Sequence, residues 1–390
     1  MKILVIGCGQ CGGRIADEFA RINIKAHKQR GIEIITDCFA VNTDVADLTG
    51  LYHIKRDSQH RIVIGSQITS GHGVGKINEV GAAIAKGESD KIIEALRHAE
   101  RFQASDAFLV VASAAGGTGS GTIAVLTQQL KMHYPEKPVY NIIVLPFKHE
   151  ELAEERIIYN TGTCLKSAFL VADAVFLVDN QRFVRSNLSL RKNLYKINSL
   201  VVEPFYNLLC AGEEGKPEYI GSRVLDAGDI MQTLSGWTSI GYGTVRIPWI
   251  RFFEKVNGDF RRKAVQAQED IRAMSAALDD LSLKCNPTDA HRALYLLCAP
   301  PEKMSMDMLE ALSNTLKNIA RDAVIRSGDY PRGKHSLDIT IVLSELRNVG
   351  RISDFFSKVI LYISAKKKQR GVESEQKRLE DAFKDIPTLL

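Results

Sequence analysis

The sequence has no long hydrophobic run, no large excess of charge of either sign, and no internal repeat or low-complexity segment. No apolar stretch in its 390 residues approaches the roughly 20 residues that a membrane helix needs. The first residues, MKILVIG, lead directly into glycines and not into a signal-peptide cleavage region. A net charge of +5 is too diffuse on this length to indicate a nucleic-acid surface. We therefore expect a cytoplasmic protein with no nucleic-acid partner and no integral membrane association.

Cysteine is present, but without the pattern of a disulfide framework or a metal site. The seven cysteines are an odd number and lie scattered in apolar segments, which favours reduced thiols in a core. Cys8 and Cys11 form a C-x-x-C pair, yet no second pair or histidine cluster accompanies it. No metal-ligating side chains are therefore assigned. The hydrophobic content of 45% is sufficient for two or three domains with their own cores.

The first half of the chain alternates strand-like and helix-like segments. This alternation predicts an α/β fold with a mostly parallel sheet that is covered by helices on both faces. Four polar or glycine-rich segments follow predicted strands, at 7–13, 42–44, 116–121 and 179–180. Ligands of such folds bind at the carboxyl ends of the strands, so we expect these four segments to meet at one edge.

The pattern changes after Asn180. A long helix is predicted from about 187 to 210, because Leu194, Ile197, Val201 and Phe205 recur at helical spacing. Glycine and proline then interrupt the chain. Strand-like runs at 238–247, 293–300 and 336–346, with helices at about 255–284 and 305–320, predict a smaller C-terminal α+β domain. The expected borders are 1–186, 187–222 for the central helix and its connector, 223–364, and 365–390 for a charged tail.

The stretch AGGTGSG at 115–121 is denser in glycine than a structural turn requires. Glycines leave backbone N–H groups accessible, and a helix that begins at such a turn adds the positive end of its dipole. Both features suit a phosphate. We therefore interpret the loop as an anion-binding segment between a strand and a helix.

Two other glycine-rich segments leave the identity of the nucleotide open. Gly7, Gly9 and Gly12 form G-x-G-x-x-G, as in an NAD(P)-dependent Rossmann oxidoreductase, whose ribose acid would be Asp37 or Asp44. That alternative gives the loop at 115–121 no role.

The third glycine-rich segment, SGHGVGKI at 70–77, is similar to a P-loop but departs from it at both ends. Ser70 stands where the first glycine belongs, and Ile77 stands where Ser or Thr would hold magnesium. Three glycine loops at one edge suit a triphosphate that is held mostly by backbone amides.

The motifs GQCGG, VNTD, GHGVGKINEVG, AGGTGSG and VDN occur in this order and spacing. Together they resemble the tubulin/FtsZ superfamily, most closely its archaeal CetZ branch, over roughly residues 1–345. The resemblance implies an N-terminal Rossmann-like GTPase domain, a long central helix and a C-terminal activation domain. It also implies GTP or GDP with Mg²⁺ as ligands, and head-to-tail assembly of subunits into filaments that act in cell shape or division.

The resemblance also implies the site residues by matching position. Residues 9–13 would meet the diphosphate, 43–44 the phosphates and magnesium, 74–76 the γ-phosphate, and 116–121 the phosphates from the other side. Ala115 stands in place of a family glycine. Asn180 would read guanine. The full set is Gly9, Gln10, Cys11, Gly12, Gly13, Arg14, Thr43, Asp44, Val74, Gly75, Lys76, Ala115, Gly116, Gly117, Thr118, Gly119, Ser120, Gly121, Glu150 or Glu154 for the ribose with Arg156 nearby, and Asn180, Tyr195 and Asn198 for the base.

None of these loops supplies an obvious residue to orient a hydrolytic water. The segment SRVLDAGDIMQTL resembles the synergy loop of the superfamily, in which two acids reach the nucleotide of the next subunit. Asp226 and Asp229 match those acids and are the expected catalytic residues, although Val224 replaces a family asparagine. The alternative is that one of them only caps the following helix. A filament scaffold without turnover is a third possibility, and the two acids argue against it.

Overall fold

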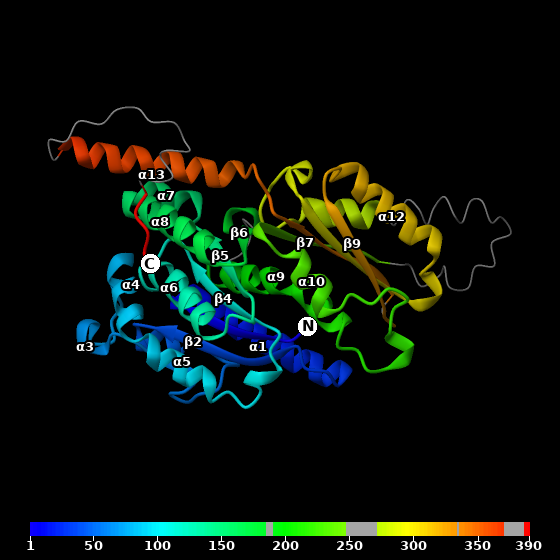
Figure 1. The fold of residues 1–390 in the computed structure, drawn as a ribbon, viewed down its shortest axis with the longest axis horizontal. Helices are drawn as coiled ribbons and strands as arrows, with labels where there is room; N and C mark the ends of the chain where they lie inside the picture. The colour runs from blue at the N-terminus through cyan, green and yellow to red at the C-terminus, as the bar shows by residue number, and fades with distance from the viewer. Residues whose placement is uncertain (185–189, 247–270, 334, 370–385) are drawn as a thin grey trace.

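The computed structural model describes residues 1–184, 190–246, 271–333, 335–369 and 386–390. Its strands form one ten-stranded sheet in the order β3-β2-β1-β4-β5-β6-β7-β10-β8-β9 (Figure 1). The strands are β1 Ile3–Cys8, β2 Ile35–Asn42, β3 Arg61–Val63, β4 Ala107–Ser113, β5 Val139–Leu145, β6 Ala174–Asp179, β7 Gly236–Arg246, β8 Arg292–Ala299, β9 Val324–Pro331 and β10 Ser336–Ser344.

The first six strands are parallel, and β7 continues the sheet parallel to β6. β10 then pairs antiparallel with both β7 and β8, while β9 is parallel to β8. Every residue of β5 is buried, as expected for a central parallel strand with helices on both faces. The predicted fold class, a mostly parallel N-terminal α/β region followed by a smaller α+β region, is confirmed, and the two regions share one sheet.

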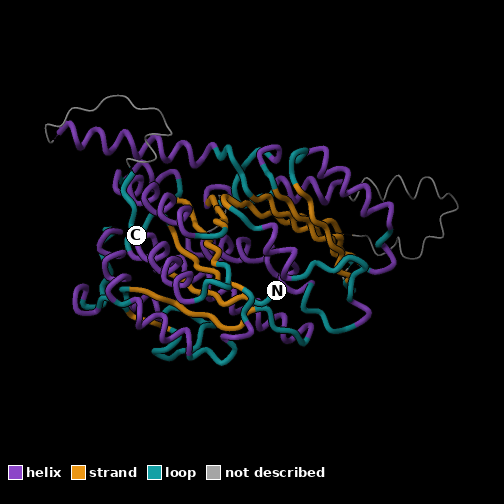
Figure 2. The backbone as a smooth tube through the Cα atoms, in the orientation of Figure 1, coloured by secondary structure: helices purple, strands orange, loops and turns teal. Residues whose placement is uncertain are grey.

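Helices lie on both sides of the strands (Figure 2). The α-helices are α1 Gly9–Arg30, α2 Val45–Thr49, α3 Ser66–Thr69, α4 Asn78–Gly87, α5 Ser89–Arg97, α6 Thr118–His133, α7 Lys148–Ala153, α8 Glu155–Val171, α9 Leu190–Ala211, α10 Ala227–Thr233, α12 Met306–Ile319 and α13 Gly350–Gln369, with a further helical stretch at 271–279. Short 3₁₀ turns are η1 Phe102–Ala104, η2 Asn180–Phe183, η3 Pro217–Tyr219, η5 Pro287–Asp289 and η6 Pro301–Lys303.

The predicted central helix is confirmed as α9. Its apolar stripe packs on α1 and on the sheet, where the ring of Phe205 lies 5.4 Å from that of Phe19 and 5.2 Å from that of Phe176. The start of the predicted helix, 187–189, lies outside the described residues, as do residues 255–270 of the helix predicted at 255–284. Strand β9 was not predicted.

The C-terminal part of the chain returns to the N-terminal region. α13 packs along α8, where the side chain of Val359 fills the space beside Gly162. α13 runs through Gln369 and so crosses the border expected at 365. Ile386 and Leu389 are buried, and their backbones contact α8: Lys166 Nζ donates to Ile386 O, and Leu389 N donates to Ser167 Oγ at 2.9 Å. The expected domain borders stay predictions.

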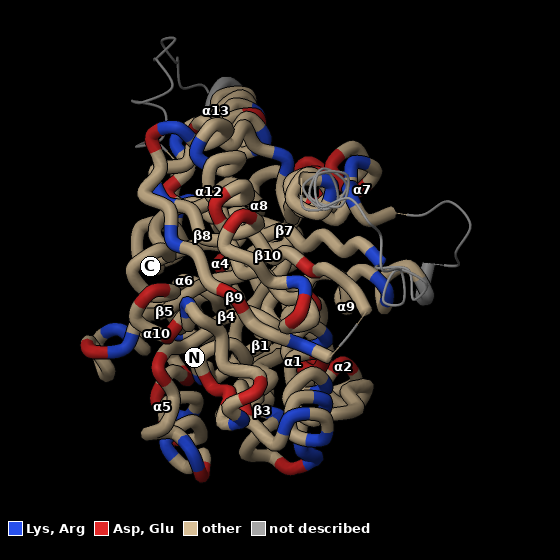
Figure 3. Tube along the Cα trace, turned by 90° about the vertical axis from the view of Figure 1, so that its right-hand side faces the viewer, with Lys and Arg blue, Asp and Glu red and all other residues tan. Residues whose placement is uncertain are grey.

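Acidic and basic residues are interspersed over the helices in the view of Figure 3, so no broad face of one charge is visible there. In the described part of the chain no helix is both long and apolar enough to cross a bilayer.

Candidate functional site

A cavity of about 430 Å³ opens at the carboxyl ends of β1, β2, β4 and β6. The structure brings many of the expected ligand-binding residues to its wall, namely Gly9, Gln10, Cys11, Arg14, Asp44, Val74, Gly75, Lys76, Ala115, Gly116, Gly117, Thr118, Gly119, Glu150, Asn180 and Asn198. The remaining expected residues do not line it; they are Gly12, Gly13, Thr43, Ser120, Gly121, Glu154, Arg156 and Tyr195. The assignment of both sets of residues as nucleotide contacts stays a prediction.

Two long helices begin at this cavity. α1 starts at Gly9 and α6 at Thr118, and within the described chain neither N-cap residue makes a side-chain hydrogen bond. Neither helix has an acidic residue in its first turn. The first N–H groups of each helix are therefore left without a side-chain acceptor, and the dipoles of both helices favour an anion. The cavity is built to bind negative charge through backbone groups.

Two different structural reasons explain why glycine occupies positions in the 116–121 loop. A Cβ on Gly117 would lie 2.5 Å from Val74 Cγ2 and 2.9 Å from Ile77 N, and one on Gly119 would lie 2.7 Å from Cys8 O. These glycines let three loops pack together at backbone distance. A Cβ on Gly116 would meet no atom within 4 Å, so this glycine faces open space beside the cavity.

Asn160, on α8, ties two of the loops together and was missed by sequence reasoning. Its side chain is fully buried, and Nδ2 lies 2.8 Å from Lys76 O, 3.1 Å from Ala115 O and 3.0 Å from Gly116 O. Asn160 Oδ1 has no hydrogen-bond partner among the described residues. The signal that could have drawn attention to it is an asparagine among the apolar residues of the segment that forms α8.

Thr43 and Asp44 follow β2. Thr43 is buried beside the cavity and shares a 2.6 Å hydrogen bond with Thr118 through their hydroxyl groups. Asp44 is the N-cap of α2, where Oδ1 accepts from Ala46 N at 2.9 Å. Asp47 also lines the cavity and accepts hydrogen bonds from Gln10 Nε2 and from Asn42 Nδ2. Asp47 was not predicted, because its role depends on a contact with α1.

The structure separates the two candidate glutamates. Glu150 lines the cavity, and its Oε2 accepts from Phe147 N at 2.9 Å to cap α7. Glu154 does not line the cavity and forms an ion pair of 2.6 Å with Lys76. Arg156 lies off the cavity, where it contacts Glu79 and donates to Asn78. Lys76 and Arg14 are the cations at the cavity wall.

Two of the three asparagines that line the cavity are those expected at the base. Asn180 directly follows β6, and Asn198 comes from α9. The turn at Asn180 is held by Asp179, whose Oδ1 accepts from Gln181 N at 3.0 Å. Tyr195, one residue beyond the cavity-lining Leu194, is 60% exposed and does not line the cavity.

Asp226 and Asp229 lie at α10, away from the cavity. Asp226 is the N-cap and accepts from Asp229 N at 2.8 Å, so the capping alternative describes Asp226. Asp229 does not cap; its Oδ1 accepts from Arg326 Nε at 3.2 Å. The helix begins at Ala227, directly after Asp226.

The cysteine thiols at the cavity are poor nucleophiles. All seven cysteines are free. Burial raises the pKa of the Cys11 thiol to about 12, although the nearby Arg14 lowers it. Burial also raises the pKa of Cys8. Among the described residues no group of three or more His, Cys, Asp or Glu side chains could hold a metal ion.

Comparison with known proteins places this geometry in a family. Residues 2–187 match the GTPase domain of the Tubulin/FtsZ family, and residues 188–360 match the C-terminal domain of tubulin-like CetZ. The tubulin-like protein CetZ1 of Haloferax volcanii is 31% identical over 370 residues, which cover 91% of this chain and 90% of the relative. The chain belongs to the CetZ branch of the tubulin/FtsZ family.

Solved structures agree with this assignment. The GDP-bound monomer of CetZ1 from Haloferax volcanii superposes with a TM-score of 0.79 at 29% identity, covering 93% of this chain and 100% of that one. The GTPγS-bound protofilament of CetZ2 from the same organism gives a TM-score of 0.79 at 26% identity, covering 94% and 100%. The family assignment confirms the expected resemblance and does not favour the oxidoreductase alternative.

Proposed function

We propose that this CetZ-family chain binds GTP in the cavity described above, assembles head to tail into filaments, and hydrolyses GTP where two subunits meet. The observation that carries the proposal is the convergence of two uncapped helix N-termini, three glycine loops and two asparagine amides on one cavity. The GDP-bound CetZ1 and the GTPγS-bound CetZ2 protofilament support it.

The phosphates would lie against the N-termini of α1 and α6, with Lys76 and Arg14 as neighbouring cations. Open space at Gly116 admits a ligand close to the backbone. Magnesium prefers carboxylate and phosphate oxygens and keeps several waters. Asp44 fits such an ion only together with the phosphates, because its Oδ1 already caps α2. Bound there, the ion would neutralise phosphate charge.

Guanine would be recognised by Asn180 and Asn198. An amide group offers both donors and an acceptor to the O6 and N1/N2 edge of guanine. Adenine has an amino donor where guanine has O6 and an acceptor where guanine has N1–H. An amide placed for guanine would therefore lose its hydrogen bonds with adenine. Each unpaired group costs about 1–3 kcal/mol, which is roughly a tenfold to hundredfold loss of affinity.

The catalytic acids would have to come from a neighbouring subunit. Asp226 lies near the start of β1, because its Cα is 3.2 Å from the position of a Cβ on Gly212, and the N-terminal amine contacts the adjacent Glu213 at 2.7 Å. The cavity lies at the other end of β1. A six-residue strand spans roughly 17–20 Å, so one subunit cannot bring Asp226 or Asp229 to its own cavity.

Exposed apolar side chains flank both regions. Ile77, Leu152 and Tyr195 are 45%, 89% and 60% exposed, and each lies within two residues of the cavity wall in sequence. Val224 and Val324 are 44% and 61% exposed beside Asp226 and Arg326. Exposed apolar side chains near two different regions suit a heterologous contact, which propagates into a filament.

The wider proposals rest on the family resemblance. We propose that the filaments act in cell shape or division and that the protein works in the cytoplasm. The proposed units are 1–186, 187–222, 223–364 and 365–390, and the change of family model at residue 188 supports the first border.

Negative-stain electron microscopy and sedimentation of the full chain with GTP, GDP and ATP test the proposal. We expect filaments with GTP, few or none with GDP, and none with ATP. A parallel titration should show a dissociation constant for GTP at least about tenfold below that for ATP. Equal affinity for GTP and ATP, or the same amount of polymer with each nucleotide, would contradict the proposed function.

A further inference from the structure

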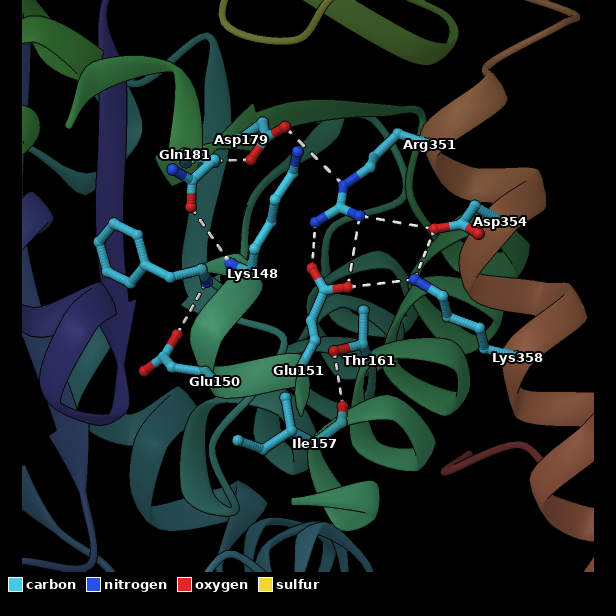
Figure 4. A network of polar contacts seen from close by, with 11 residues as sticks. Lys148, Glu150, Glu151, Ile157, Thr161, Asp179, Gln181, Arg351, Asp354 and Lys358 are labelled. Atoms are coloured by element: carbon cyan, nitrogen blue, oxygen red, sulfur yellow. Dashed lines mark hydrogen bonds and ion pairs between the residues drawn. The ribbon is translucent and has the colours of Figure 1, made fainter. Parts of the chain in front are cut away.

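Arg351, near the start of α13, lies between two acidic residues of the N-terminal region (Figure 4). Its guanidinium contacts both carboxylate oxygens of Glu151 on α7, with Nη1 3.4 Å from Oε2 and a shorter contact between Nη2 and Oε1. Its Nε lies 3.8 Å from Asp179 Oδ2 at the end of β6. One side chain from the C-terminal region therefore joins two elements of the GTPase domain.

Each of the two acids is the sequence neighbour of a cavity-lining residue. Glu151 follows Glu150, and Asp179 precedes Asn180. The loops are also linked directly, because Gln181 Oε1 accepts from Lys148 N at 3.3 Å. A movement of Arg351 would therefore be transmitted to both Glu150 and Asn180.

The contact is shielded from water and held in place. The side chain of Glu151 is 6% exposed, and those of Arg351 and Asp179 are each 16% exposed. The guanidinium stacks over the ring of Phe355, with Cζ 4.5 Å from the ring centre. Removal of Arg351 leaves the buried Glu151 carboxylate with one cation fewer and takes the Nε contact from Asp179, and loss of a cation from a buried pair costs more than loss of a surface ion pair.

Lys358, about two helical turns further along α13, contributes a second cation. Its Nζ lies 3.3 Å from Glu151 Oε2 and 2.7 Å from Asp354 Oδ2. Of the two acids that Arg351 joins, Lys358 contacts Glu151 alone, whereas Arg351 contacts both Glu151 and Asp179 (Figure 4). The bridge between α7 and β6 therefore depends on Arg351.

We infer that Arg351 is a positioning residue of the nucleotide site, which couples α13 to guanine-nucleotide affinity by fixing Glu150 relative to Asn180. This inference rests on the proposed function, because it assigns those two residues to the ribose and the base. Any partner that displaces α13 from α7 would then lower the affinity for guanine nucleotide.

The test uses the full chain and mant-GDP, so that filament assembly does not affect the titration. We expect Arg351→Gln to raise the dissociation constant of mant-GDP by about tenfold or more. Arg351→Lys keeps the charge but cannot span both acids, so its effect should fall between wild type and Arg351→Gln. Arg347→Gln is the matched control, because Arg347 is exposed and its side chain forms no ion pair within the described chain.

A second arm requires no nucleotide. Hydrogen exchange of the apo protein should be faster over α7 and η2 in Arg351→Gln and unchanged in Arg347→Gln. Unchanged hydrogen exchange over α7 and η2 in Arg351→Gln overturns the inference. So does a folded Arg351→Gln that binds mant-GDP with wild-type affinity and shows only a lower melting temperature. Failure of the wild type to bind mant-GDP contradicts the proposed function instead, and the exchange arm still decides the coupling. If Arg351→Gln does not fold, the graded comparison of Arg351→Lys with wild type decides in both arms.

Discussion

Replacement of Asn160 by alanine tests the construction of the cavity. Hydrogen bonds from its Nδ2 join the segment that carries Lys76 to the loop that carries Ala115 and Gly116. Both segments line the cavity. We expect Asn160→Ala to loosen them and to weaken GTP binding, although Asn160 itself does not line the cavity.

The magnitude follows from the carbonyl groups that lose a donor. Gly116 O keeps a hydrogen bond from Ser120 Oγ, so only the carbonyls of Lys76 and Ala115 lose their side-chain donor. Each hydrogen bond contributes about 1 kcal/mol net, for a total of about 2 kcal/mol. Affinity falls tenfold per 1.4 kcal/mol, so GTP should bind roughly 30-fold more weakly.

Asn141→Ala is the matched control. Asn141, on β5, is also fully buried and also has an Oδ1 without a partner among the described residues. It donates to Thr127 Oγ1 on α6 at 2.8 Å, and neither residue lines the cavity. Fluorescence titration with mant-GTP and thermal melts on both variants separate the effects. We expect both to melt at lower temperature and only Asn160→Ala to lose affinity. Equal affinities in the two variants would refute the reasoning.

Two further predictions concern catalysis and pH. Asp229→Ala should keep GTP binding and sedimentable polymer but lower phosphate release by about 10²–10⁴-fold. Asp226→Ala should chiefly lose about 1 kcal/mol of stability, because it removes the cap of α10. Near-normal phosphate release by Asp229→Ala would contradict the catalytic role of Asp229. Burial opposes protonation of His60, but hydrogen bonds to Asp37 and Asp57 outweigh it and raise the pKa of His60 above 6.5. This contribution to stability is complete below about pH 6.5 and is lost as the pH rises through the raised pKa, so denaturant titrations should show a decline over that window that His60→Gln flattens.

The parts of the fold with a local cause could be predicted from the sequence. An apolar run followed by glycines and a helical pattern specifies β1 with α1 and β4 with α6, and the stripe through Ile197 and Val201 specifies α9. β9 could not be predicted, because VIRSGDYP carries charges, a glycine and a proline and lacks clear alternation. Its strand conformation depends on pairing with β8.

The candidate site divides in the same way. Glycine loops are visible in the sequence, since few other residues permit such close backbone approach. The contacts of Asn160, Asp47 and Arg351 join segments that lie far apart in the chain, up to 200 residues for Arg351 and Glu151. A single sequence carries no record of such pairs. Leu194 and Asn198 line the cavity from α9, whereas Tyr195 does not, and its assignment to the base stays a prediction.

Completion of the active site by a neighbouring subunit is the central claim, and mixing two defective variants tests it most directly. Asp229→Ala leaves the cavity intact, and Gly116→Leu places a side chain in the open space beside the cavity while leaving Asp229 intact. Each variant alone should release little phosphate from GTP. Because the α10 region of the second variant can meet the GTP of the first, the mixture should hydrolyse GTP well above the sum of its parts. A mixture that stays at that sum at concentrations where polymer sediments would contradict the account.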